Sequence, residues 1–228
     1  EYYEMSHLFS QWGAKYAPKV VAVVDGKEEK IFGWHTPAVG EYTRFLHSFL
    51  PALIEKLREW DIAGVTYFHI SDEPREAHLE SFKAAKESLG NLLDGFHTFD
   101  ALSSYEFYRH GLIDKPIPGN NEIEEFLSHG LKDMWTYYCT GQFYEVSNRF
   151  MSMPSARNRI YGVQLFKYDI IGILHWGYNF YNSQFSIDHI NPYEVTDSGN
   201  AFPSGDPFLV YPGSDGHPEE SIRMMVHY

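Results

Sequence analysis

Strand-like and helix-like segments alternate along most of this chain, and this alternation constrains the fold more than any other feature. Runs rich in β-branched and aromatic residues lie at 65–72, 94–100, 134–139 and 171–176. Helical patterns separate or precede these runs, at 41–60, 75–89, 121–129 and 155–168. Because parallel neighbours need a crossover connection, usually a helix, this spacing predicts an α/β fold with a parallel sheet.

The clearest single element is the segment 41–60. Apolar residues recur in it at spacings of three and four, namely Phe45, Leu46, Phe49, Leu50, Leu53, Ile54, Leu57 and Trp60. This period predicts an amphipathic helix, and we expect Pro51 to kink it.

Two architectures fit the alternation, an open doubly wound sheet and a (β/α)8 barrel. No glycine-rich phosphate fingerprint follows a strand, and polar and aromatic residues crowd the strand ends, which favours the barrel. Only six barrel strands can be placed, at 2–9, 65–72, 94–100, 134–139, 171–176 and 208–211. A further strand is expected at 20–24, and a long loop at 179–206. We therefore expect a TIM-type barrel that is incomplete within residues 1–228, which form a single catalytic domain.

Composition narrows the range of partners. The net charge of −13 disfavours binding to nucleic acid, and no apolar run approaches the ~20 residues that a membrane span needs. Tyr, Trp and Phe make up 17% of the chain, which suits sugars or other ring-shaped ligands. The single Cys139 excludes a multi-cysteine metal site, and we expect neither a metal nor an organic cofactor.

Two adjacent carboxylates, Asp72 and Glu73, stand where a buried strand ends at Pro74. Mutual repulsion and partial burial would keep one protonated as a general acid while the other stays charged, as in glycosidases. We expect Pro74 to hold Glu73 extended and a local twist to bring both side chains to one site. The alternative is structural, with Asp72 capping the next helix and Glu73 in its first turn.

Adjacent carboxylates suit the substrate-assisted glycosidases, in which a 2-acetamido oxygen of the substrate is the nucleophile. At this point several motifs become informative together. They are FSQWGAKYAPKVVA (9–22), IFGW (31–34), YFHISDEP (67–74), MWTYYCTGQ (134–142), LHWGYNFY (174–181) and GDPFLVYPG (205–213). In this order they resemble the catalytic domain of glycoside hydrolase family 123, within the wider group catalogued as domain of unknown function 4091.

The resemblance implies a retaining, exo-acting β-N-acetylgalactosaminidase-like enzyme that acts on a glycan or glycoconjugate. It implies that Asp72 orients the acetamido group and that Glu73 is the general acid/base. It also implies a (β/α)8 barrel, preceded by a β-sandwich, with the carboxylate pair ending strand four. Segments 2–9 and 65–72 would then be strands three and four, and 94–100, 134–139, 171–176 and 208–211 would be strands five to eight. We therefore expect this chain to be a fragment whose first barrel strands lie upstream. A secreted, periplasmic or cell-surface location fits the resemblance.

Aromatic and amide side chains near the strand ends are candidates for a sugar subsite. Alternation places Trp176 and Tyr178 on one face, and Tyr137 on a face opposite to Tyr138, which we expect to pack against helices. The other candidates are Asn179, Trp12 and His35. In each case the alternative is ordinary packing in the core or in a loop.

Two other functions remain open. His69 with His7 or His97 could hold zinc in a metal-dependent barrel hydrolase, although no HxH or HExxH pair is present. A non-catalytic carbohydrate-binding protein would use the aromatic faces without needing Asp72 and Glu73.

Overall fold

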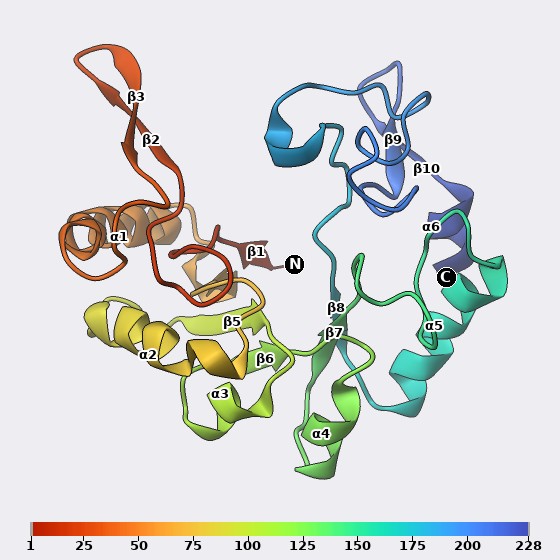
Figure 1. Cartoon of the computed structure of the whole chain (residues 1–228), viewed down its shortest axis with the longest axis horizontal. Helices are drawn as coiled ribbons and strands as arrows, with labels where there is room; N and C mark the ends of the chain where they lie inside the picture. The colour runs from red at the N-terminus through yellow and green to blue at the C-terminus, as the bar shows by residue number, and fades with distance from the viewer. Residues whose placement is uncertain (1, 228) are drawn as a thin grey trace. The chain divides into compact units, whose positions relative to one another are not determined.

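The structure is a computed structural model that describes residues 2–227 (Figure 1). The chain divides into two compact units, Glu1–Ile117 and Pro118–Tyr228. Each unit has secondary structure of both kinds, and each is described by itself below.

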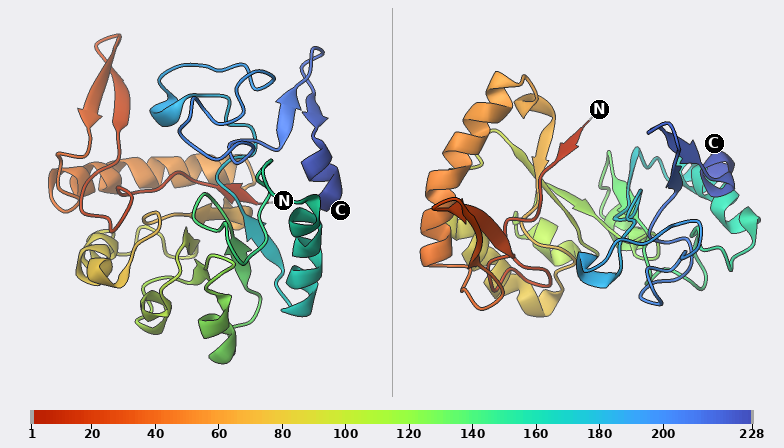
Figure 2. Two further views of the ribbon diagram at one scale, coloured as in Figure 1. Left: turned by 45° about the vertical axis from the view of Figure 1, so that its right-hand side comes forward. Right: turned by 90° about the horizontal axis from the view of Figure 1, so that it is seen from above.

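The first unit is built on a four-stranded parallel sheet in the order β1-β4-β5-β6. Its strands are short, and their bounds are β1 Tyr3–Glu4, β4 Thr66–Phe68, β5 His97–Ala101 and β6 Lys115–Ile117. The helices of this unit are α1 Glu41–Glu59, η1 Ala63–Val65, η2 Glu76–His78, α2 Leu79–Ser88 and α3 Tyr105–Arg109. Figure 2 shows α1 (orange) and α2 (yellow) beside the sheet. The antiparallel hairpin of β2 (Val20–Val24) and β3 (Lys27–Phe32) projects away from it (Figure 1).

The core of the first unit lies where the helices pack on the sheet. The helix α1 contributes Leu46, Leu50 and Leu57, all nearly inaccessible to solvent, and continues through Pro51. Phe68 and Ile70 reach the same core from β4 and from the segment just after it. The predicted helix is therefore confirmed, and Leu46, Leu50, Ile54 and Leu57 of its predicted apolar positions are buried, whereas Phe49 and Trp60 are exposed.

The second unit contains one parallel pair of strands, β7 (Trp135–Tyr137) and β8 (Gly172–Leu174). The helix α5 (Ser155–Lys167) makes the crossover between them, and α4 (Ile123–Ser128) precedes β7. A second sheet pairs β9 (Val210–Pro212) with β10 (Pro218–Glu220) in antiparallel fashion, and α6 (Ile222–His227) follows.

The long segment between β8 and β9 is ordered by local contacts. It holds the short helix η3 (Gln184–Ser186) and two isolated antiparallel bridges, Asn179 to Phe208 and Asn182 to His189. The predicted loop at 179–206 is therefore folded back on itself.

The expected α/β class with a parallel sheet is confirmed, and two strand predictions are corrected. Sequence analysis missed β6 at Lys115–Ile117. It also assigned 208–211 to the barrel, whereas β9 pairs antiparallel with β10 because the turn between them returns the chain directly alongside. The parallel strands are thus β1, β4, β5, β6, β7 and β8, and residues 2–227 form no closed barrel. None of the helices within residues 2–227 has the length and apolar character needed to cross a bilayer.

Candidate active site

Asp72 and Glu73 lie just beyond β4 and are fixed there by backbone hydrogen bonds on two sides. The carbonyl oxygen of Asp72 accepts a hydrogen bond of 2.8 Å from the N–H of Trp12. The N–H of Glu73 donates one of 3.0 Å to the carbonyl oxygen of Ala101, at the end of β5. The pair is therefore positioned by two neighbouring segments of the same unit.

The backbone of Glu73 departs from the expected conformation. Its φ angle is +42°, in the left-handed region, so the prediction that Pro74 holds it extended is wrong. Proline disfavours the right-handed helical region for the preceding residue, and the left-handed region is the other way for the chain to turn. A residue with a Cβ in this region costs of order 1–3 kcal/mol, and such strain concentrates at functional sites.

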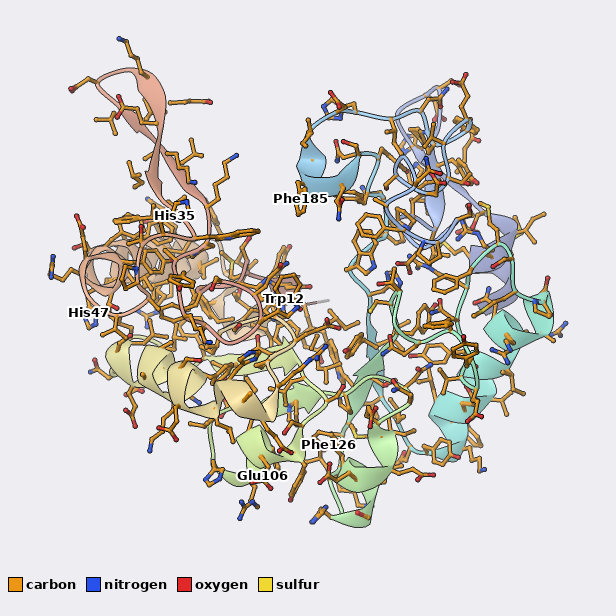
Figure 3. The ribbon with its side chains drawn as sticks, viewed as in Figure 1. Trp12, His35, His47, Glu106, Phe126 and Phe185 are labelled. Carbon is orange, nitrogen blue, oxygen red and sulfur yellow. The ribbon has the colours of Figure 1, made fainter. Side chains whose placement is uncertain are left out.

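Ser71 ties the loop that carries Trp12 to the carboxylate pair. Its hydroxyl donates to the carbonyl oxygen of Ser10 at 2.8 Å and accepts from the N–H groups of Gly13 and Ala14, each at 3.2 Å. Ser71 is fully buried, while Trp12 keeps 57% of its surface exposed (Figure 3). An exposed indole of this kind offers a flat apolar face that can pack on the apolar face of a sugar.

A buried imidazole lies just before the pair in the chain and is held by two carboxylates. His69 Nδ1 is 3.0 Å from Asp100 Oδ1, and His69 Nε2 is 2.7 Å from Glu4 Oε1. Burial opposes protonation, but the hydrogen bonds to Asp100 and Glu4 raise the pKa of His69 to about 9. His69 is therefore an imidazolium at neutral pH that donates from both ring nitrogens.

Asp100 connects this imidazolium to the backbone before the carboxylate pair. Its Oδ1 accepts from the N–H of Ile70 at 3.1 Å, and its Oδ2 accepts from the N–H of Ser71 at 3.3 Å. Asp100 is completely buried, and burial raises its pKa to about 6 against the opposing effect of His69. The network of Glu4, His69 and Asp100 thus fixes the end of β4.

The environment of Asp72 disfavours its charged form. Burial, followed by repulsion from Glu73 and Asp100, raises the pKa of Asp72 to about 7, although His69 opposes the shift. His7 Nε2 lies 3.8 Å from Asp72 Oδ1. Burial and the positive charge of His69 lower the pKa of His7 to about 4, so His7 is neutral and does not compensate Asp72.

The helix-cap alternative for the pair is wrong. The helix η2 begins at Glu76 with Arg75 as its N-cap residue, and α2 begins at Leu79. Asp72 therefore lies three residues before the N-cap position, and Glu73 lies outside the first turn. Neither carboxylate therefore caps a helix.

The structure brings together a cluster of side chains that could suit the zinc alternative, but their ligand atoms are not free to bind a metal. His7, His69 and Asp100 offer ligand atoms within 4.8 Å of one another, whereas His97 lies on β5 and stacks on Tyr67. A metal ligand needs a free lone pair, and both ring nitrogens of His69 are bonded to carboxylates. The residues do not fit a metal in this arrangement.

In the second unit, Trp176 is anchored by a buried carboxylate. Its Nε1 donates to Asp206 Oδ2 at 3.0 Å, and His175 Nε2 lies 3.2 Å from Asp206 Oδ1. Trp176 keeps 42% of its surface exposed, and the Phe202 ring packs on it at 4.7 Å between ring centroids. The indole is therefore held in one orientation while part of its surface stays open to a ligand.

Arg149 holds the same part of the second unit together from the inside. Its Nη2 donates to the carbonyl oxygens of Gly177 and, at 2.8 Å, of Asp206, and it lies 3.0 Å from His175 Nδ1. Only 2% of Arg149 is exposed. The segment that carries Trp176 is therefore fixed to the segment that carries Asp206.

The other predicted sugar-binding residues of this unit differ in exposure. Tyr178 is 48% exposed, and Asn179 is exposed and bridges to Phe208. Tyr137 lies in β7 and is 8% exposed, so it offers little surface to a ligand within this unit. Tyr138 is buried and packs edge-on against Tyr161 of α5, which confirms the prediction that it faces a helix.

The candidates fall into two groups that the structure describes separately. In the first unit, Trp12 contacts Asp72 through its backbone, whereas His35 is exposed in the loop after β3 (Figure 3) and no described contact joins it to the pair. In the second unit, Trp176, Tyr178 and Asn179 are close in the chain.

Sequence reasoning missed three residues that shape these groups: Glu4, Arg149 and Asp206. Glu4 lies within a predicted strand. Its partner His69 is far away in the chain, so their contact leaves no local pattern in the sequence. Asp206 lies within the GDPF motif. A carboxylate between a glycine and a proline was therefore the sequence signal that could have identified it as a site residue. Arg149 lies in an irregular segment, where burial has no periodicity to reveal it.

Comparisons with known proteins identify the family of this chain and a solved structure with a similar fold. The family model described as "Glycoside hydrolase 123, catalytic domain" matches residues 2–228, which confirms the resemblance expected from the motifs. Among solved structures, the chain is similar to a family 123 glycoside hydrolase from Clostridium perfringens, from a structural study of glycolipid glycan hydrolysis. The TM-score is 0.64 at 19% identity, over 92% of this chain and 37% of that one, so the likeness shows a shared fold. A comparison with curated proteins gave no match.

Proposed function

Since this chain belongs to the family of glycoside hydrolase 123 catalytic domains, we propose that it contributes the catalytic carboxylates for hydrolysis of a terminal 2-acetamido sugar. The substrate class is a β-linked N-acetylhexosamine, of the N-acetylgalactosamine type, on a glycan or glycoconjugate. The structural study of the relative from Clostridium perfringens concerns the hydrolysis of glycolipid glycans, so these glycans are the first substrates to test.

In the proposed mechanism the substrate supplies its own nucleophile. The acetamido oxygen attacks the anomeric carbon and forms an oxazolinium ring, while the glycosidic oxygen leaves with a proton from Glu73. Asp72 orients the acetamido N–H and stabilises the positive charge that develops there. Glu73 then removes a proton from water, which opens the ring with net retention of configuration.

The observation that carries this proposal is the geometry at the end of β4. Two adjacent carboxylates are held by Trp12 and Ala101, neither caps a helix, and Glu73 adopts a left-handed backbone conformation. Strain of this kind persists only where surrounding contacts enforce it, and here both carboxyl groups belong to one short, fixed segment.

Recognition of the sugar is assigned to the exposed rings and amides. Trp12 lies beside the pair, and Trp176 and Tyr178 are half exposed, so each can cover the apolar face of a pyranose ring. Tyr137, Asn179 and His35 are proposed as further substrate contacts. We also propose that the six parallel strands correspond to strands three to eight of a (β/α)8 barrel, with β6, β7 and β8 as strands six to eight.

The proposal is tested by comparing leaving groups. In Glu73→Gln, hydrolysis of an alkyl 2-acetamido glycoside should fall by about 10²–10⁴-fold, because its leaving oxygen needs a proton. An activated aryl glycoside should be spared most of this loss. In Asp72→Asn both substrates should slow by about 10²–10³-fold, because ring formation is required for departure in each.

Glu76→Gln is the matched control, since Glu76 is an exposed carboxylate three residues from Glu73. Its rates should equal those of the unchanged protein, and thermal unfolding should show that all three variants are folded. Equal losses on both leaving groups in Glu73→Gln would contradict its role as the acid. Hydrolysis of glycosides that lack the acetamido group would contradict substrate assistance.

A further inference from the structure

His69 is a buried charged side chain to which the proposed mechanism gives no part. Only 1% of the residue is exposed, and its ring nitrogens lie 3.0 Å from Asp100 Oδ1 and 2.7 Å from Glu4 Oε1. The ring of Phe99 packs on it, with 4.1 Å between ring centroids. Burying a charge is costly unless it is paired and hydrogen-bonded, and here both ring nitrogens are bonded to carboxylates. His69 is therefore a fixed positive charge inside the first unit.

One imidazole contacts both His69 and Asp72. The ring of His7 packs on the ring of His69 with 4.5 Å between centroids, and His7 Nε2 lies 3.8 Å from Asp72 Oδ1. Burial and the charge of His69 lower the pKa of His7 to about 4, so His7 is neutral at pH 7. The charge of His69 therefore acts on Asp72 across protein atoms rather than across bulk water, which strengthens the interaction.

The backbone connects the two side chains as well. Asp100 Oδ1, which binds His69, also accepts from the N–H of Ile70, and Asp100 Oδ2 accepts from the N–H of Ser71. Ser71 is the residue directly before Asp72. The separation of His69 from the segment that carries the pair is therefore fixed by the fold.

The charged groups that act on Asp72 oppose one another. Burial disfavours its charged form most, and the carboxylates of Glu73, Asp100 and Glu4 disfavour it further. The positive charge of His69 favours the charged form. Together these effects raise the pKa of Asp72 to about 7. The proposed mechanism needs Asp72 as an anion, because it stabilises a developing positive charge, so a counter-charge for this carboxylate is required.

We propose that His69 is a positioning residue that acts on the hydrolysis through Asp72, by supplying the counter-charge that keeps this carboxylate ionised. Glu4 weakens that counter-charge, because it binds His69 with a negative charge of its own. His69 is too deeply buried to contact the sugar itself. The inference rests on the proposed function, since it assigns His69 a part in the same reaction.

Two variants change the charge near Asp72 in opposite directions. His69→Gln removes the positive charge, so Asp72 should take up its proton at a higher pH. Glu4→Gln removes a negative charge and keeps an oxygen that can accept from His69, so Asp72 should take up its proton only at a lower pH. The side chain of Glu4 is 51% exposed, so Glu4→Gln should fold even where the buried His69→Gln does not.

The acidic limb of kcat/KM on an activated aryl 2-acetamido glycoside measures these changes. Departure of such a leaving group needs little protonation by Glu73, so the limb reports the ionisation of Asp72. We expect its midpoint to rise by about 0.5–1 pH unit in His69→Gln and to fall by at least about 0.3 pH unit in Glu4→Gln. A loss of packing alone would lower the rate at every pH without moving the midpoint.

Glu28→Gln is the matched control for the change of charge. Glu28 is an exposed glutamate of the hairpin formed by β2 and β3. Its replacement removes the same charge as Glu4→Gln but at a site remote from Asp72 in contacts, so the midpoint should stay where it is in the unchanged protein.

Unfolding supplies a second measurement that needs no substrate. Within each background, the free energy of unfolding is compared with that of the same protein carrying Asp72→Asn. This difference changes with pH, and the upper end of the change marks the ionisation of Asp72 in the folded protein. It should lie at higher pH in His69→Gln and at lower pH in Glu4→Gln. Failure of the proposed hydrolysis leaves this measurement intact, so the two proposals are tested separately.

Two results would overturn the role of His69. The first is an ionisation of Asp72 that stays in place in Glu4→Gln and in a folded His69→Gln. The second is a change in the same direction in both variants, which would indicate a structural disturbance instead of an effect of charge. If the unchanged protein shows no hydrolysis, the unfolding curves decide between these outcomes.

Discussion

Asp72 is influenced by two histidines, His7 and His69, whose pKa values are shifted in opposite directions. Burial and the charge of His69 lower the pKa of His7 to about 4, while the bonds to Asp100 and Glu4 raise that of His69 to about 9 despite its burial. The positive charge near Asp72 is thus already shared by two other carboxylates. This explains why burial is able to raise the pKa of Asp72 to about 7.

Because its pKa is raised, the ionised form of Asp72 destabilises the folded protein by an amount that can be measured. In the unfolded chain this carboxyl loses its proton near pH 4, and in the folded protein near pH 7. The protonated Asp72 carboxyl favours the folded state. Its contribution to the free energy of unfolding is therefore fully present below pH 4 and is lost as pH rises through about 7. We expect Asp72→Asn to match the unchanged protein near pH 4 and to exceed its free energy of unfolding by up to about 4 kcal/mol at pH 8.

Urea unfolding at a series of pH values measures this difference. Asp94→Asn, at an exposed aspartate, is the control and should show no comparable change with pH. A constant difference between Asp72→Asn and the unchanged protein from pH 4 to pH 8 would contradict the shifted pKa.

At the residue scale, the sequence predicted the pair but not its geometry. Adjacent carboxylates before Pro74 are evident in the sequence, and so is the end of the strand. The left-handed turn at Glu73 is not evident, because proline excludes one region for the preceding residue without selecting between the others. The partners of His69 come from strands β1 and β5, so only the folded sheet brings them together.

At the scale of elements, the pairing of β7 with β8 depends on one glycine. Gly172 is paired with Trp135 across the two strands. A Cβ at Gly172 would lie 2.4 Å from atoms Cδ2 and Cε2 of the indole, far inside normal contact. The absence of a side chain at Gly172 therefore lets the indole of Trp135 lie across β8.

We expect Gly172→Ala to lower the free energy of unfolding by about 1–3 kcal/mol, through overpacking against Trp135. In the Trp135→Leu background the same change should cost at least about 1 kcal/mol less, because the smaller side chain relieves the clash. Denaturant unfolding of the four proteins gives this coupling.

Gly64→Ala is the matched control, because no atom other than those of the adjoining backbone lies within 4 Å of the Cβ it would add. Its effect should stay within about 1 kcal/mol of zero. Additive costs for Gly172→Ala and Trp135→Leu would show that the indole is not what requires the glycine.

Elements with a long period were predictable, and short ones were not. The helix α1 repeats its apolar period along its whole length, so its bounds of Glu41–Glu59 nearly match the predicted 41–60. The strand β6 has three residues, one of them Pro116, and gives no alternation to detect. The strand β9 looks like a buried parallel strand, but its antiparallel partner β10 is a polar run that carries no strand signal.

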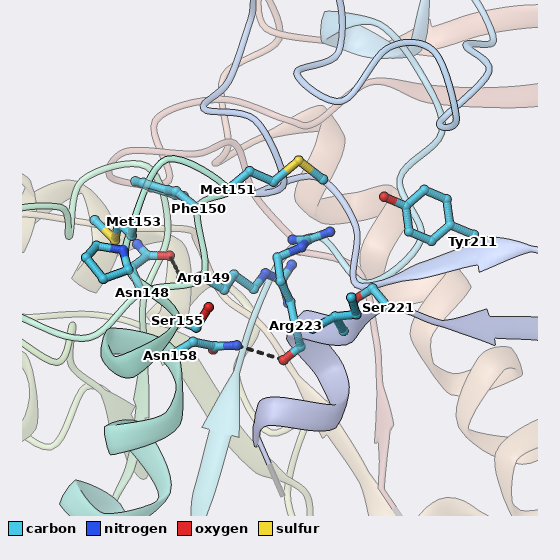
Figure 4. Close-up of a pocket in the computed structure, with 12 residues that line it drawn as sticks. Asn148, Arg149, Phe150, Met151, Met153, Ser155, Asn158, Tyr211, Ser221 and Arg223 are labelled. Carbon is cyan, nitrogen blue, oxygen red and sulfur yellow. Dashed lines mark hydrogen bonds between the residues drawn. The ribbon is translucent and has the colours of Figure 1, made fainter.

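At the scale of the whole molecule, the order of elements predicted the fold class and the family, because both depend on many residues spread along the chain. A cavity at the start of α5 (Figure 4) was not predictable in this way. Its polar groups come from Arg149, Asn158 and Arg223, which belong to an irregular segment and two helices with no common pattern. A cavity assembled from such segments becomes visible only when tertiary contacts are known.

The net charge of −13 gives the whole molecule a predictable response to salt. Excess negative charge destabilises the compact state through self-repulsion, and ions screen that repulsion. We expect the unfolding temperature at pH 8 to rise by about 2–4 °C when sodium chloride is raised from about 0.02 M to about 0.3 M. Near the isoelectric point of about 5.3 the repulsion vanishes, so the same addition of salt should have a much smaller effect. Calorimetric unfolding at both pH values measures the two responses, and an equal rise at pH 8 and pH 5.3 would mean that the salt acts by a mechanism other than screening of the net charge.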